Sequence, residues 1–451
     1  MGMVWSRAQQ IGVPLGLIVV LVGMVHWGGT ATPGPVFVLG VAVLIGLIVG
    51  FAGFLYWLLF SPIQNAVVVK PNPVLRQLGA IAVLTSATLM TFATAWDESW
   101  HRRFGVGNDF LWMPHILMYS SFAICSLLAS AGMVYLVLRG QGGLRSRARA
   151  EPLVALLACV SLFLLFSAPS DLLWHRIYGL DITAWSLPHI TLLLGFIGLM
   201  LCGITLALSH TKTTIWQGLR GIGLNEWLTI WLCGTALMFM LQFGTTEWDN
   251  ITKERFENRV SKISIFWERP EWLYVAALLG VTGFIGAFVQ NATKRVGVAT
   301  LVGLFLIVQR AIALSLIGGF DLGMSLRSHL LALMVLMAID LIAYWRKNAI
   351  WTWIYALSSG GLALTFLMLG MSQILIYPRV NLDTILGHVL AGGLSWCGFS
   401  YVGALLGRNV SSMEKLEAVQ VVWLPRLTVA ALTSVMTLLM VAIFTAVPPA
   451  L

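Results

Sequence analysis

Charged residues are scarce in this sequence. Only 10% of its residues are charged and 59% are hydrophobic, whereas a soluble domain has roughly 25% charged residues. The net charge of +9 does not indicate nucleic-acid binding, because the basic residues fall in short loops between apolar runs, where the positive-inside rule accounts for them. The composition therefore predicts a polytopic membrane protein whose main partner is the lipid bilayer.

Cysteine pairs and soluble segments are also missing. The five cysteines all lie in apolar runs and none forms a CxxC pair, which favours buried thiols over disulfides or zinc sites. No linker or low-complexity tract interrupts the chain, so residues 1–451 are predicted to form one integral-membrane domain. The first apolar run, 11–28, has no clear cleavage site and is read as a retained span.

Thirteen apolar runs are long enough to cross a bilayer as helices, which need about 20 residues each. They lie near 11–28, 36–60, 77–97, 111–138, 152–170, 189–209, 226–246, 272–290, 297–318, 327–345, 350–376, 384–406 and 425–447. The predicted fold is all-α, with about thirteen transmembrane helices.

The loops predict an orientation. Basic residues cluster after the even-numbered runs, as at Arg145, Arg147 and Arg149, so these loops and the N-terminus are placed in the cytoplasm. Seven of the eight histidines then fall at the outer face, which is periplasmic if the membrane is a bacterial inner membrane. These seven are His26, His101, His115, His175, His189, His329 and His388; His210 is the exception.

One motif at that face occurs twice, 74 residues apart: Asp, three residues, His, thirteen residues, His. The first copy is Asp97, His101 and His115, and the second is Asp171, His175 and His189. Trp, Arg, Gly and Pro residues match at the same offset (Trp100/Trp174, Arg102/Arg176, Gly105/Gly179, Pro114/Pro188). Residues i and i+4 share a helix face, and Pro suits a first helical turn. Each copy is therefore read as a helix end, a short loop and a helix start on which three ligands converge.

The motif lies within repeated helical hairpins. The predicted repeat units are 77–138, 152–209 and 226–290, with weaker copies at 297–345 and 350–406. In the third unit Pro270-Glu271 replaces Pro-His, and Asp249, Glu247 and Glu271 are read as a third ligand set; the alternative is a solvated, salt-bridged loop. In an enzyme, Glu247 and Glu271 are also candidate proton relays. The last two units keep only His329 and His388, for which isolated capped histidines are the alternative.

Buried charge also requires a partner. Arg310 lies well inside the ninth run, which is costly in a bilayer. We expect it to pair with a carboxylate, and Asp340 qualifies only if the packing brings it close.

Imidazole and carboxylate without thiolate suit copper, zinc, iron or manganese, and three protein ligands leave positions open for substrate. The duplication is compatible with two metals or with one shared site. The alternative is structural: Asp and His pair with each other and with Arg102 or Arg176, and so close off the helix ends. Trp100 and Trp174 are read either as interfacial belt residues or as the apolar wall of a pocket.

The motif resembles the metal site in the third subunit of the copper membrane monooxygenases, the particulate methane and ammonia monooxygenases. There an Asp, a His one turn later and a second His after a short loop bind copper near the outer side of the membrane; here the histidines are one residue further apart. The sequence WHRRFG, followed by PH, also resembles a group of bacterial polytopic membrane proteins. The resemblance implies copper as the cofactor, oxygen as co-substrate, an external reductant such as a quinol, and a small apolar substrate.

Three functions follow from these observations. The first is a copper-dependent membrane oxidoreductase with Asp97, His101, His115, Asp171, His175 and His189 as ligands. The second is a non-catalytic subunit that associates with other membrane subunits of a respiratory or oxidase complex. The third is a transporter for a metal ion or small solute, which repeated hairpins favour. Transport ranks last because the ionisable residues crowd one face, whereas transport sites usually lie near the midplane.

Overall fold

Long apolar sequences in a bilayer must satisfy their backbone polar groups internally, and helices do this. The computed structural model describes residues 12, 15–16, 18–23, 35–63, 72–104, 112–139, 143–178, 185–209, 222–249, 270–345, 352–375, 378–413 and 423–446. Within these ranges every regular element is a helix, which confirms the predicted all-α class.

The helices follow the apolar runs closely. They are α2 (Pro35–Leu59), α3 (Pro73–Phe104), α4 (Met113–Arg139), α5 (Leu144–Ala150), α6 (Pro152–Tyr178), α7 (Leu187–Leu208), α8 (Leu224–Asp249), α10 (Glu271–Thr293), α11 (Val298–Leu316), η3 (Phe320–Leu322), α12 (Arg327–Trp345), α13 (Thr352–Ile374), α14 (Leu382–Ser411) and α15 (Trp423–Thr445).

Among the described residues, ten helices are long and apolar enough to cross a membrane: α3, α4, α6, α7, α8, α10, α11, α12, α14 and α15. They make the chain an integral membrane protein. The predicted count of thirteen is not confirmed. In α2 the apolar stretch is the shorter Ile45–Leu59, and most of the run 11–28 lies outside the described residues.

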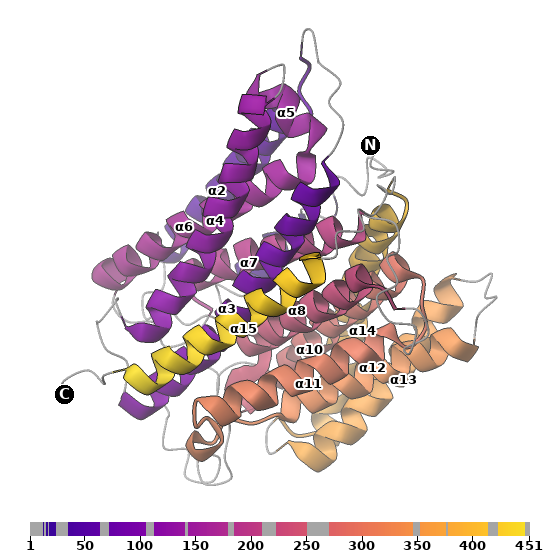
Figure 1. Ribbon diagram of the computed structural model, residues 1–451. Coiled ribbons are helices and arrows are strands. Elements are labelled where there is room, and N and C mark those ends of the chain that lie inside the picture. Colours follow the sequence, from indigo (N-terminus) through magenta and orange to yellow (C-terminus); the bar gives the residue numbers. More distant parts are fainter. Residues whose placement is uncertain are drawn as a thin grey trace. The chain divides into compact units, whose positions relative to one another are not determined.

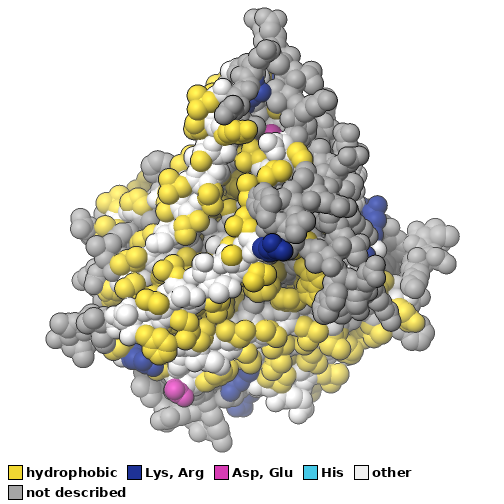
Figure 2. Space-filling model, in the orientation of Figure 1, with side chains coloured by type: hydrophobic (Ala, Val, Ile, Leu, Met, Phe, Trp, Pro, Cys, Tyr) yellow, Lys and Arg dark blue, Asp and Glu magenta, His cyan; other side chains and the backbone are white. Residues whose placement is uncertain are grey.

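The surface fits a lipid environment. Hydrophobic side chains spread over the described face in Figure 2, and few charged ones interrupt them. Leu138, Leu394 and Phe444 are 78%, 76% and 79% exposed. Water-soluble monomers rarely leave apolar surface of this extent uncovered, so these side chains are expected to face acyl chains.

Residues 1–4, 95–105 and 229–413 form one compact unit, here the first unit. In it α10 packs against α11, α12 and α14, and α12 packs against α11 and α13 (Figure 1). The contact between α10 and α14 brings the two backbones together. A Cβ added at Gly403 or Gly407 would collide with the carbonyl oxygens of Phe284 and Phe288. Small residues four apart allow such close approach between membrane helices.

Residues 5–94, 106–228 and 414–451 form the second unit. In it α6 packs against α4 and α7. A buried ion pair joins the first turn of α3 to the residue before α6: Arg76 Nε is 2.8 Å from Glu151 Oε2, and the backbone N–H of Asn72 donates to the other carboxylate oxygen. Burial raises the pKa of Glu151, and Arg76 partly opposes that shift.

Candidate metal site

Helix α3 carries the first two residues of the first motif. It continues to Phe104, past the predicted end of the apolar run at residue 97, so Asp97 and His101 are one turn apart on one helix. His101 Nε2 lies 3.5 Å from Asp97 Oδ2. The prediction that these two side chains share a face is confirmed.

The third residue stands at the beginning of α4. Helix α4 begins at Met113, so Pro114 and His115 occupy its first turn as predicted. The His115 ring stacks on Trp112, with centroids 6.0 Å apart and planes 15° apart, and lies 6.0 Å from the ring of Tyr119. These aromatic contacts limit how the imidazole can turn.

Together Asp97, His101 and His115 make a compact donor group. Each offers one ligand atom, these atoms lie within 4.8 Å of one another, and each residue is half-buried. Two atoms bound at about 2.1 Å to one tetrahedral ion are about 3.4 Å apart, given the usual metal–nitrogen and metal–oxygen distances. The 3.5 Å between His101 and Asp97 fits that geometry, and the donor set suits copper, zinc or iron.

Aromatic side chains adjoin this group on α3. Trp100 is buried and packs edge-on against Trp96 and Phe104, with centroids 5.7 and 4.8 Å away. This packing agrees with the interpretation of Trp100 as part of an apolar wall.

The second motif has the side chains of two of its three predicted ligands in the described part of the chain. Asp171 on α6 and His189 on α7 approach each other, with Oδ1 and Nε2 3.7 Å apart. The other ring nitrogen, Nδ1, is 3.0 Å from the Ser186 hydroxyl, which fixes the ring and turns Nε2 toward Asp171. His175 follows Asp171 by one turn of α6, but its side chain lies outside the described residues.

A proline marks the approach to this motif. Pro169 lies inside α6, two residues before Asp171. Because proline has no N–H, the carbonyl of Leu165 loses its partner four residues on, which weakens the helix there. At the equivalent position of the first motif, 74 residues earlier, the residue is Ala95.

The arginines pair differently from the structural alternative. Arg102 donates to Glu98 Oε1 at 2.9 Å, whereas that alternative paired it with the motif's own Asp and His. The side chain of Arg176 lies outside the described residues. The Asp–His approaches themselves agree with either a metal site or a hydrogen-bonded lock.

The candidate relays are not part of the donor group. Glu271 stands in the first turn of α10, half-buried, where Arg379 is its electrostatic neighbour and His388 lies beside its backbone. The side chain of Glu247 and residues 250–269, which hold most of the acidic loop, lie outside the described residues. His26 and His210 do too.

Two histidines and one arginine outside the donor group were also singled out by the sequence. His329 and His388 are fully buried. Arg310 approaches a carboxylate as predicted, and this carboxylate is that of Glu98, 3.7 Å away. Asp340 instead accepts hydrogen bonds from Thr300 and Gln290. Sequence analysis missed Glu98; its place beside Asp97 on a charged helix end was the available signal.

Comparisons with protein-family models, with curated proteins and with solved structures find no match.

Proposed function

We propose that the chain is a membrane-embedded, copper-dependent oxidoreductase of monooxygenase type. The observation that carries the proposal is the convergence of Asp97, His101 and His115 within 4.8 Å. Two imidazoles and one carboxylate form an open coordination set of the kind that catalytic metal sites use. Copper is chosen over iron and zinc because the spacing resembles the copper motif of the membrane monooxygenases.

The residues have separable tasks in this proposal. Asp97, His101 and His115 hold the metal, and Trp112 restricts the ring of His115 by stacking. Copper bound there supplies a centre able to exchange electrons with oxygen and an external reductant. Buried Trp100 keeps that side of the helix apolar, which suits a small apolar substrate arriving through lipid.

Asp171, His175 and His189 are proposed as a second ligand set. Its support is the 3.7 Å approach of Asp171 to His189 and the duplication of the motif. Glu271 is the proposed proton relay, with Glu247 as the second candidate. The proposed orientation keeps the N-terminus in the cytoplasm and both motifs at the outer face of a bacterial inner membrane.

The test is metal content. The purified full chain would be analysed by elemental mass spectrometry beside His101→Ala, His115→Ala and Asp97→Asn. Asp383→Asn is the matched control, since Asp383 is an exposed carboxylate in the first turn of α14. One or two copper ions per chain, lowered in the three variants and unchanged in the control, is the expected result. A folded wild-type chain without stoichiometric metal would end the proposal.

A second candidate is a non-catalytic subunit of a larger membrane complex. The Asp–His approaches at two helix ends favour it, because they can fasten hairpins without a metal. In that case the motif variants would have lower thermal stability than the wild type, and neither the wild type nor the variants would contain metal.

A further inference from the structure

The positive charge of Arg310 is buried and is not fully neutralised by the described residues around it. It lies on α11 and is 0% exposed. Arginine stays protonated in proteins and has five N–H donors. Yet none of its three nitrogens makes a hydrogen bond with a described group. Its ion pair with Glu98 spans 3.7 Å, longer than a hydrogen bond.

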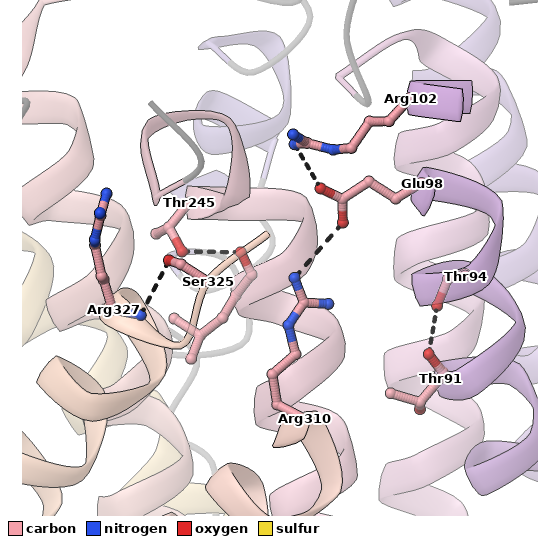
Figure 3. Close-up of polar contacts among 9 residues, drawn as sticks. Thr91, Thr94, Glu98, Arg102, Thr245, Arg310, Ser325 and Arg327 are labelled. Atoms are coloured by element: carbon pink, nitrogen blue, oxygen red, sulfur yellow. Dashed lines mark hydrogen bonds and ion pairs between the residues drawn. The ribbon is translucent and has the colours of Figure 1, made fainter. Parts of the chain in front are cut away.

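Glu98 is also shared. Its Oε1 accepts a hydrogen bond from Arg102 at 2.9 Å, while Oε2 faces Arg310 (Figure 3). Among the described ion pairs, one carboxylate thus stands between two guanidinium groups. The closer partner is Arg102, so Glu98 can leave Arg310 and keep its stronger bond.

His329 lies on α12 beside this charge. Its side chain is 1% exposed, and neither ring nitrogen has a hydrogen-bond partner among the described residues. Arg310 is its electrostatic neighbour. A neutral imidazole always has one N–H to donate. The flanking Ser328 is already bonded to Tyr274 at 2.8 Å and does not compete.

The described acid of α12 is engaged elsewhere. Asp340 of α12 takes Thr300 and Gln290 as partners. Buried polar groups are nearly always hydrogen-bonded, and each exception in a native structure requires an explanation. Here the exceptions are donors gathered around a surplus positive charge, which is the chemistry that recognises an anion.

We infer that Arg310 and His329 form a binding site for a small monovalent anion, of the size of chloride or formate. Glu98 is the tethered competitor: its carboxylate occupies the approach to Arg310 until an anion displaces it toward Arg102. Because the Glu98 side chain is 20% exposed while that of Arg310 is 0%, the anion reaches the arginine past Glu98. This inference does not depend on a metal at Asp97.

The experiment measures the thermal unfolding midpoint of the full chain in a nonionic detergent. Sodium chloride and sodium formate would be titrated against sodium gluconate, whose anion is too large, at constant ionic strength. A ligand that binds only the folded state raises the midpoint with its concentration. We expect a saturable rise with chloride and formate and none with gluconate.

Two substitutions should act in opposite directions. Glu98→Gln removes the competitor and should lower the half-saturating anion concentration at least tenfold. Arg310→Gln should abolish the response, and Arg408→Gln, at an exposed arginine of α14, should leave it unchanged. If Arg310→Gln does not fold, His329→Asn decides, with an expected loss of several-fold in anion affinity. A response equal in wild type and Glu98→Gln, or unchanged in His329→Asn, would overturn the inference.

Discussion

His101 Nε2 stands 3.5 Å from Asp97 Oδ2, one turn apart at the end of a single helix. The helix backbone alone sets this separation, so the pair needs no long-range packing to form. His115, at the start of the next helix, lies close enough to this pair to complete the three-residue donor group.

Asp97→Asn should therefore weaken metal binding while leaving the fold intact. The amide keeps the shape of the carboxylate but loses its charge, and we expect copper affinity to fall by at least about tenfold, a loss that perturbation of metal sites commonly causes. Competition with a chromophoric chelator measures the affinity. An affinity equal to that of Asp383→Asn would remove Asp97 from the ligand set.

Ser186→Ala tests the second motif. The hydroxyl of Ser186 lies 3.0 Å from His189 Nδ1, and such outer contacts orient metal-binding histidines, at a cost of about 10–100-fold in affinity when lost. We expect the second bound ion to weaken by that factor and the first to be unaffected. Ser186→Thr keeps the hydroxyl and should behave as wild type. Equal losses at both ions would show a general defect instead.

Stability should depend on pH through Glu151. Burial raises its pKa in the folded state above the usual value of 4.5 for a glutamate. Between that value and the folded pKa, the folded chain holds a proton that the unfolded chain has released, so stability falls as pH rises through this window. Thermal unfolding from mildly acidic to neutral pH, compared with Glu151→Gln, measures the effect. The glutamine variant should lose this part of the pH dependence; an unchanged profile would contradict the assignment.

Gly403→Ala should destabilise the first unit strongly. The added methyl group would meet the Phe284 carbonyl oxygen, and forcing extra volume into a tight contact typically costs about 1–3 kcal/mol. Gly398→Ala on the same helix is the matched control, because a Cβ there has nothing within 4 Å. Replacing an open helical glycine should be neutral or stabilising by about 0.5–1 kcal/mol. Equal unfolding midpoints for the two variants would argue against the close helix contact.

Hydropathy predicted where helices lie but not where they end. The apolar run ends at residue 97, yet α3 continues to Phe104. Similarly, α6 continues from residue 170 to Tyr178. Hydropathy reports preference for lipid, whereas helix continuation depends on backbone hydrogen bonds, which a charged turn also makes. The Asp and the first His of each motif lie at these polar helix ends.

The local part of the site was predictable and the distant part was not. Helical spacing gave the Asp97–His101 pair, and the repeated Pro-His placed His115 and His189 in first turns. The pairing of Arg310 with Glu98 joins residues far apart in the sequence, and Asp340 was an equally valid partner by residue type. Only the packing of α11 against the end of α3 decides between them.

Pro169 gives the two copies of the motif different mechanical properties. Asp97 lies on an uninterrupted helix that starts at Pro73, so its position is held by a continuous backbone hydrogen-bond ladder. Asp171 follows Pro169, where the backbone hydrogen-bond ladder of α6 is interrupted, and lies on the short helical segment that ends at Tyr178. The two copies of the motif therefore place the same chemical groups on helix ends of different expected rigidity, with the first copy on the stiffer one.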